Sequence, residues 1–179
     1  IADQHGMALP ANDVAGLAPY VHIDESAPGL MAFIDRFEHM NAVLVDADAC
    51  RRVAYENVED AKREGIDYIE LRYSPWFMAE SHGMDPAEVM EACADGVRAA
   101  ERDTGVRVNI IGILSRTYGV DTAWQELEAL LQHRDRLVGL DLAGDEANWP
   151  GELFVDHIKR GRDAGWQISV HAGDAAGPE

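Results

Sequence analysis

Apolar and β-branched residues are concentrated in four short stretches of the chain, and each stretch predicts a β-strand. Their length and their nearly continuous apolar character are typical of strands buried inside a sheet. Each stretch is followed directly by polar or charged residues, which places its carboxyl end at a surface. The predicted strands are Ile66 to Tyr73, Val106 to Leu114, Leu137 to Ala143 and Trp166 to Ala172.

Between the predicted strands, apolar residues recur every three or four positions, which is the spacing of amphipathic helices. The second of these helices has the clearest start signals: Asp85 is a good N-cap, Pro86 suits the first turn, and Glu88 lies three residues after the cap. Gly105 is expected to end it. The other helices are expected after Asp46 or Asp48 and up to Gly65, from Thr122 to His133, and from Glu152 to Ala164.

The alternation of strand, helix, glycine and strand predicts a parallel α/β architecture. Periodicity alone leaves an open sheet and a (β/α)₈ barrel equally possible. We expect a single domain over residues 1–179, in which residues 1–45 form a helical, lid-like segment before the strand and helix repeats. No GxGxxG or GxxxxGK[ST] loop is present, so no nucleotide-phosphate cradle is expected.

Charge and cysteine content narrow the choice of partners. The chain has 15 Lys and Arg against 33 Asp and Glu, a formal net charge of −18, which disfavours nucleic acid and anionic membrane surfaces. No apolar run approaches the roughly 18 residues that span a bilayer, and no signal peptide is visible. Cys50 and Cys93 both fall on apolar helix stripes, which favours buried reduced thiols and a cytoplasmic location.

Charged and metal-binding side chains follow every predicted strand at its carboxyl end, where α/β proteins place their sites. One such strand end could be a structural ion pair, but four in succession favour a functional site. The strand ends carry Glu70 and Arg72, then Ser115 and Arg116, then Asp141, Asp145 and Glu146, and finally His171 and Asp174.

His171 is the strongest candidate for a metal ligand. A lone histidine on an apolar strand is more often a hydrogen-bonded core residue, but the small residues Ala172 and Gly173 leave room beside it. Asp174 could reach a water or substrate held next to a metal on His171, as metal-assisted hydrolysis requires. Zinc needs at least three protein ligands and this segment offers one. The other histidines show no ligand spacing, and Ser74 and Ser115 lack a GxSxG motif.

Several motifs, in the correct order and covering essentially the whole chain, resemble the adenosine deaminase family. The run SVHAGDAAGPE at Ser169 to Glu179 is similar to the VHAGEAAGPE segment of bacterial members. DLAGDE at Asp141 to Glu146 matches a second motif at the same distance before the histidine. The runs Asp48 to Pro75 and Gly112 to Gly119 are similar to the family throughout.

The resemblance implies a (β/α)₈ TIM barrel, of which strands 2 to 5 with their helices are present, and one zinc ion per complete active site. It implies a purine-salvage enzyme that hydrolyses adenosine or deoxyadenosine to inosine or deoxyinosine and ammonia. By position, His171 is implied to be a zinc ligand, Asp174 the acid that protonates the purine ring, and Gly144 the residue whose backbone amide binds a ring nitrogen. Leu30, Phe33 and Phe37 resemble the apolar lid over the nucleoside, although ordinary helix packing explains them equally well.

Two departures from the family pattern qualify these expectations. Asp174 stands where the family has glutamate, and the other zinc ligands of the family have no counterpart in the 179 residues. We therefore expect either part of a longer chain or a truncated product that associates with itself and is inactive alone. A deaminase for another aminopurine, or an inactive barrel fragment with a binding role, remains as an alternative.

Overall fold

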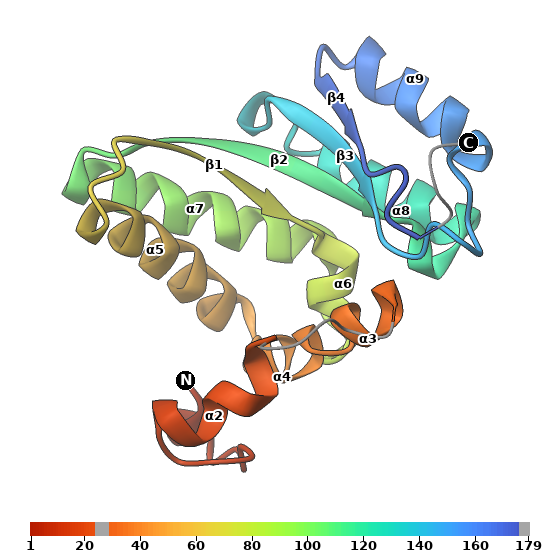
Figure 1. Cartoon of the computed structure of the whole chain (residues 1–179). Helices are drawn as coiled ribbons and strands as arrows, with labels where there is room; N and C mark the ends of the chain where they lie inside the picture. Colours follow the sequence, from red (N-terminus) through yellow and green to blue (C-terminus); the bar gives the residue numbers. More distant parts are fainter. Residues whose placement is uncertain (24–28, 176–179) are drawn as a thin grey trace.

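The computed structural model describes residues 1–23 and 29–175, and its centre is a parallel sheet of four strands. The strands lie side by side in sequence order, without a reversal (Figure 1). A doubly wound sheet would reverse its order at a switch point, whereas consecutive order is that of a barrel wall. The strands are β1 (Tyr68–Tyr73), β2 (Arg107–Ser115), β3 (Gly139–Ala143) and β4 (Gln167–Val170).

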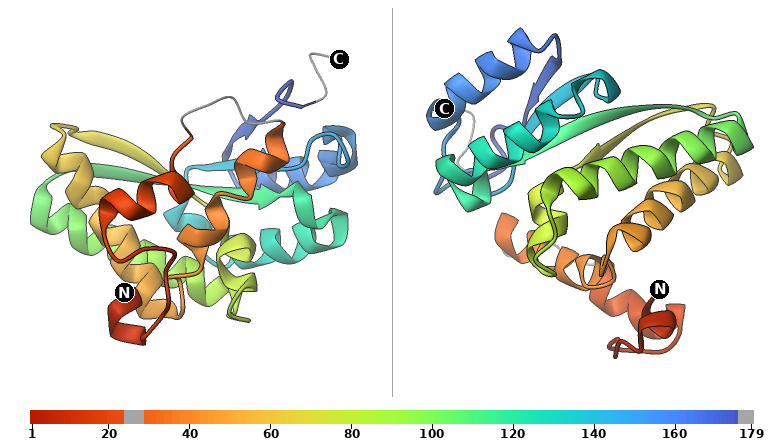
Figure 2. Two further views of the ribbon diagram at one scale, coloured as in Figure 1. Left: turned by 60° about the horizontal axis from the view of Figure 1, so that its bottom comes forward. Right: turned by 180° about the vertical axis from the view of Figure 1, so that it is seen from behind.

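The long helices cover one face of this sheet, as the view from behind shows in the right panel of Figure 2. Consecutive helices are neighbours there, so each βα unit packs beside the preceding one. The long helices are α5 (Ala47–Arg63), α7 (Pro86–Thr104), α8 (Val120–Leu131) and α9 (Val155–Asp163). Shorter elements connect them: α6 (Pro75–Glu80) and the 3-10 turns η1 (Arg116–Tyr118), η2 (Arg134–Arg136) and η3 (Gly151–Phe154).

The predicted helix signals act as expected. Asp46, rather than Asp48, caps α5: its carboxylate accepts a hydrogen bond of 2.8 Å from the Ala49 amide. Asp85 likewise accepts a bond of 2.9 Å from the Ala87 amide at the start of α7. Because an unsatisfied first turn costs about 1 kcal/mol, these caps fix where each helix begins.

The predicted element bounds either match the structure, as at Tyr73 and Ala143, or differ from it by up to three residues. Leu137 and Trp166, predicted as the first residues of two strands, precede the observed strands β3 and β4. Both side chains are buried, at 6% and 5% exposure. Apolar character therefore marks burial, not strand membership, at these positions. The third helix begins at Val120, since Gly119 at a φ of 84° turns the chain. The fourth begins as the turn η3, and only Val155–Asp163 is α-helical.

The hydrophobic core lies between the sheet and its helices. Strand residues Leu114, Leu140 and Leu142 are almost completely buried there against helix residues such as Val89 and Val97. Full burial of such side chains contributes about 1.5–3 kcal/mol each. Cys50 and Cys93 are also buried in this layer, as the apolar helix stripes predict, and both are free cysteines. Burial raises the pKa of the Cys50 thiol to about 11, so this sulfur is unreactive.

Four short helices precede the sheet: α1 (Ala2–His5), α2 (Val14–Val21), α3 (Leu30–Ile34) and α4 (Phe37–Asn41). All four lie within the described part of residues 1–45, the segment for which helices are expected from the sequence. Two hydrogen bonds join its end to the region of α6: Asn41 donates to the Phe77 carbonyl at 3.1 Å, and His82 contacts the Ala42 carbonyl at 3.1 Å. Since α6 follows β1, this segment is attached at the carboxyl end of the sheet.

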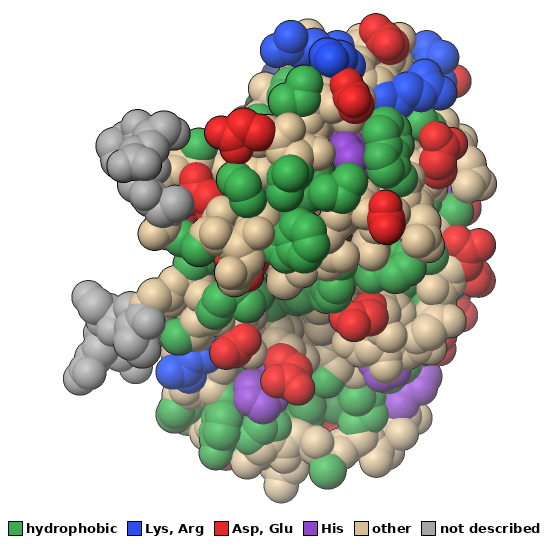
Figure 3. Space-filling view, turned by 90° about the vertical axis from the view of Figure 1, so that its right-hand side faces the viewer, with side chains coloured by type: hydrophobic (Ala, Val, Ile, Leu, Met, Phe, Trp, Pro, Cys, Tyr) green, Lys and Arg blue, Asp and Glu red, His purple; other side chains and the backbone are tan. Residues whose placement is uncertain are grey.

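The face of the sheet opposite the helices is partly exposed. Strand residues alternate, so that Ile69, Leu71 and Tyr73 of β1 point into the core while Glu70 and Arg72 point away from it. The pattern differs from that expected for strands buried on both faces, because the four strands of the described sheet do not close into a barrel and leave this face open. On the α8 and α9 side, acidic side chains are scattered while Lys and Arg gather at the top (Figure 3). Within the described residues, none of the helices is both long and apolar enough to cross a membrane.

Candidate active site at the carboxyl ends of the strands

Side chains from three strands meet at the carboxyl end of the sheet. Arg72 of β1 forms an ion pair with Asp141 of β3, and its Nη2 lies 2.9 Å from Nε2 of His171, which follows β4. Nε2 of His171 lies 3.6 Å from Oδ2 of Asp141. The register of the parallel strands explains why Arg72 and Asp141 meet. Arg72 pairs with Ile111 and Asp141 with Ile113, so β2 places only uncharged side chains between them. The structure thus brings together the charged ends of the first, third and fourth strands.

The contacts of His171 define the state of its imidazole ring. An arginine guanidinium can only donate, so Nε2 of His171 must accept from Arg72. Nδ1 then carries the proton of the neutral ring and donates a hydrogen bond of 3.1 Å to Oδ2 of Asp174. A carboxylate that orients one imidazole nitrogen while the other presents its lone pair is the usual arrangement around a histidine that binds a metal.

Asp141 is fully buried, yet its Oδ1 has no hydrogen-bond partner within the described part of the chain. Leaving such an oxygen without a donor or a cation costs about 1–3 kcal/mol or more. Its Oδ2 is occupied by Arg72. The unpartnered oxygen therefore indicates that this end of the sheet is built to receive a further donor or a positive charge.

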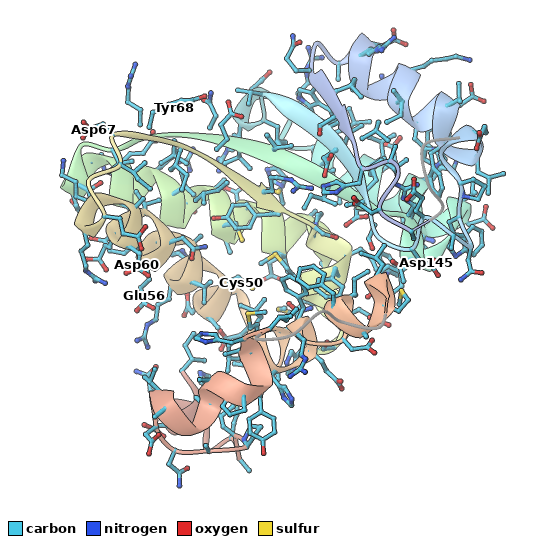
Figure 4. The ribbon with its side chains drawn as sticks, in the orientation of Figure 1. Cys50, Glu56, Asp60, Asp67, Tyr68 and Asp145 are labelled. Atoms are coloured by element: carbon cyan, nitrogen blue, oxygen red, sulfur yellow. The ribbon has the colours of Figure 1, made fainter. Side chains whose placement is uncertain are left out.

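The turn after β3 contains Gly144, which is placed at a φ of 112°. A side chain is excluded there, because an added Cβ would lie 2.4 Å from Oγ1 of Thr117. The same hydroxyl accepts a 3.0 Å hydrogen bond from the amide of Asp145. Figure 4 places Asp145 at the site end of the sheet, opposite Asp67 and Tyr68. Gly144 therefore leaves the backbone bare at this turn, and its role in substrate binding stays a prediction.

Gly144→Ala should destabilise the protein by about 2–4 kcal/mol, since it combines backbone strain with a side-chain clash. Gly65→Ala is the matched control: Gly65 also has a positive φ, 78°, but an added Cβ would have nothing within 4 Å. The control should lose only the strain, about 1 kcal/mol. Urea denaturation of the two variants measures the difference. Equal losses would show that the Thr117 contact is not tight.

Two buried charged side chains hold the segment from His171 to Ala175. Arg116 is 1% exposed and donates to the His171 carbonyl oxygen, with a second bond of 3.4 Å to the Trp149 carbonyl. Glu146 accepts hydrogen bonds from the Gly173 amide at 2.7 Å and the Ala175 amide at 2.9 Å. Sequence reasoning placed both residues at strand ends but could not foresee these partners. Charge-assisted bonds of this kind are about twice as strong as neutral ones.

Glu126 is a buried carboxylate that sequence reasoning missed. It lies on α8 among core residues and accepts hydrogen bonds from the Ser74 hydroxyl at 2.7 Å, the Trp76 amide at 3.0 Å and the Ser115 amide at 2.7 Å. These donors come from the ends of β1 and β2 and the start of α6. Glu126 therefore ties two strand ends to α8. The available signal was an acidic residue within the apolar stripe of Ala123, Leu127 and Leu130.

Burial outweighs the donors and raises the pKa of Glu126 from 4.5 to about 7. The folded state thus binds this proton more tightly than the unfolded state, so its stabilising effect is complete below about pH 4.5 and is lost as the pH rises to about 7. Tyr118 lies close to Glu126, and its hydroxyl bonds Glu80 at 2.8 Å.

Glu126→Gln should therefore remove part of the pH dependence of stability. We expect the stability of the native protein, relative to the variant, to fall between pH 5 and 7 by at most about 1.4 kcal/mol per pH unit. Denaturation of both proteins at four pH values measures this. Glu152→Gln, at an exposed position, is the control. Parallel pH profiles for native protein and Glu126→Gln would contradict the assignment.

The described residues fit one ligand position of a zinc site. The neutral imidazole of His171 offers the Nε2 lone pair, and Asp174 orients the ring through Nδ1. Arg72 now occupies that lone pair and would have to move aside. Within residues 1–23 and 29–175, no group of three or more His, Cys, Asp or Glu side chains could hold a metal by itself. The remaining ligands would have to come from outside these residues.

Some predicted residues are not part of this cluster. Glu70 accepts from the Tyr68 hydroxyl, further from the carboxyl end of the strand. Ser115 contributes its backbone amide to Glu126. Phe33 and Phe37 pack edge to face with ring centres 5.3 Å apart, so ordinary packing is observed and their lid role stays a prediction. The last residues of the Ser169–Glu179 motif, 176–179, lie outside the described part.

A parallel sheet in consecutive order, with a polar cluster at the carboxyl ends of its strands, places the chain in the class of (β/α)₈ barrels, of which it forms one part. Two solved structures agree in fold, each with a TM-score of 0.78 and each matched over 96% of this chain. One is an amidohydrolase from B. ambifaria with bound zinc, 24% identical, of which 46% is covered. The other is an adenine deaminase from Arthrobacter aurescens, 25% identical, of which 51% is covered.

Within that class, the chain belongs to the adenosine deaminase family, whose model matches residues 1–179. The adenosine deaminase of Edwardsiella ictaluri is 56% identical over all 179 residues. These residues correspond to 54% of that relative, so the chain spans about half the length of the curated relatives it matches. Both the family resemblance and the partial barrel predicted from the sequence are confirmed.

Proposed function

We propose that the protein carries out the zinc-dependent hydrolytic deamination of adenosine and deoxyadenosine, giving inosine or deoxyinosine and ammonia, within purine salvage. The observation that carries the proposal is the 56% identity, over every residue of this chain, to a relative named adenosine deaminase. The cluster of Arg72, Asp141, His171 and Asp174 supports it, because it lies where barrel enzymes bind their substrates.

Zinc, when bound, would supply Lewis-acid activation of water near neutral pH. His171 would provide one of its ligands through Nε2. As water adds to C6 of the purine, electron density moves onto the neighbouring ring nitrogen. The bond from C6 to the exocyclic amino group breaks afterwards, when that group has taken up a proton from the added water and leaves as ammonia. Asp174 would deliver a proton to that nitrogen, which is general acid catalysis worth about 10²–10⁴ in rate. The amide of Gly144 would donate to a second ring nitrogen and hold the base in place.

The alternative substrate is another aminopurine, because one of the solved structures of similar fold is an adenine deaminase from Arthrobacter aurescens. The identity to that protein is 25%, against 56% for the adenosine deaminase of Edwardsiella ictaluri. We therefore favour a purine nucleoside over the free base. A cytoplasmic location accompanies the proposal and is supported by the two unbonded, buried thiols.

The test is an ultraviolet absorbance assay with adenosine, deoxyadenosine and adenine, on protein whose intact mass and zinc content are known. Three samples are compared: the complete protein that carries these residues, the 179 residues alone, and a chimera in which they replace the matching part of the Edwardsiella ictaluri enzyme. We expect the complete protein and the chimera to bind zinc and deaminate nucleosides.

The 179 residues alone should be inactive and should associate, because β1 and β4 have free edges within the described sheet. Light scattering measures that association. Folded, zinc-loaded complete protein that deaminates none of the three compounds would overturn the proposed function. Activity on adenine alone would overturn the nucleoside assignment.

A further inference from the structure

The segment that carries His171 and Asp174 has little regular structure of its own, since β4 ends at Val170. Its geometry is instead imposed by side chains from two other strand ends. Arg116, directly after β2, bonds the His171 carbonyl, and Glu146, in the loop after β3, bonds the amides of Gly173 and Ala175. The segments that follow β2, β3 and β4 are thereby joined to one another by hydrogen bonds.

The two oxygens of Glu146 bind the amides on either side of Asp174. Oε1 accepts from Gly173 and Oε2 from Ala175, at 2.7 and 2.9 Å. With the amide before and the amide after it both held, the backbone of Asp174 has little freedom to rotate. The Asp174 carboxylate remains half exposed and directed at Nδ1 of His171. Glu146 thus fixes the backbone of Asp174 and leaves the Asp174 carboxylate free to contact other groups.

Burying these charges is costly, which argues that they have a specific task. Glu146 is 9% exposed and Arg116 is 1% exposed. A buried charge costs several kcal/mol unless it is paired and hydrogen-bonded. A neutral side chain could fill the same space, but it could not accept from two amides with both of its terminal atoms. The carboxylate is the group that suits this geometry.

We propose that Glu146 is a positioning residue, aided by Arg116, that sets the direction of the Asp174 carboxyl group and the His171 imidazole. The inference rests on the proposed function, in which those two side chains contact substrate and metal. Glu146 itself touches neither group in that scheme. It acts on rate through the backbone of the segment, so its loss should lower kcat and leave KM for the nucleoside nearly unchanged.

The test uses Glu146→Gln in the complete protein, with Glu152→Gln as the exposed control. Glutamine keeps the size but turns an NH₂ group toward one of the two amides. We expect kcat to fall about 10- to 100-fold and zinc to pass faster to a chelator, as when groups that orient metal ligands are removed. Glu146→Asp, which restores two acceptor oxygens on a shorter stem, should recover part of the rate.

If Glu146 had a merely structural role, its replacement would lower the melting temperature without lowering kcat or speeding zinc release. A kcat per folded molecule within twofold of the native value, at unchanged zinc release, would overturn the inference. A second readout does not need activity: the ring ¹⁵N shifts of His171 in metal-free protein. The native ring should carry its proton on Nδ1, and Glu146→Gln should give a mixture of tautomers. If the native protein neither binds zinc nor deaminates, the proposed function fails, and an unchanged tautomer in the variant overturns the inference separately.

Discussion

Replacing His171 by alanine in the complete protein should remove zinc and lower the deamination rate by about 1,000-fold or more. The ring is the one imidazole in the strand-end cluster, and its Nε2 lone pair is the donor available to a metal. Loss of a ligand leaves the metal with too few protein donors. Metal analysis and the absorbance assay, made on the same sample, measure both effects.

His5→Ala is the control for this prediction, because His5 is exposed in α1 and does not belong to the strand-end cluster. Figure 1 marks the N-terminus, where α1 begins, well away from β4. Circular dichroism shows whether each variant is folded. A folded His171→Ala protein that keeps stoichiometric zinc and more than a tenth of the native rate would show that His171 is a packing residue.

The substitution Asp174→Glu is expected to have the second large effect: it should raise the deamination rate by up to about 100-fold. In the structure the short carboxylate is drawn back to Nδ1 of His171 at 3.1 Å. One more methylene would advance the carboxyl group by roughly 1–1.5 Å toward the substrate, a displacement large enough to matter for proton transfer. Steady-state kinetics with adenosine measure the change.

Asp174→Asn separates two possible tasks of this residue. As the proton donor, Asp174 should be irreplaceable by asparagine, with a loss of about 10²–10⁴ in rate. If it served only to orient His171, asparagine could still accept from Nδ1 through its amide oxygen, and the loss would be small. An unchanged or lower rate in Asp174→Glu, together with a mild Asp174→Asn, would count against the acid role.

Local signals made most of the fold predictable. Asp46, Asp85 and the left-handed glycines Gly65 and Gly105 each act within a few residues of the chain, and each does what its type favours. The parallel sheet followed from the alternation of strands and helices. The choice between an open sheet and a barrel wall did not follow, because periodicity describes one element at a time and strand order is a property of the whole.

The candidate site was predictable in its location and less so in its contacts. His171, Asp174 and Gly144 all lie at the carboxyl ends of strands, as the sequence predicts. The link between Arg72 and Asp141, which are 69 positions apart, depends on strand register. Glu126 was missed because an acidic residue on a helix is normally placed in solvent. Only the donors from Ser74, Trp76 and Ser115 make its burial tolerable.

The consecutive order of the sheet also bears on how the protein is made. Each strand pairs with the one synthesised just before it, so every new strand and helix can dock on a surface already formed. No pairing in the sheet has to close a loop longer than one crossover helix with its turns, and folding during synthesis proceeds from the N-terminal side. The free edge of the most recent strand is then the template for its successor. Growth of the barrel wall should therefore keep pace with translation, one βα unit at a time.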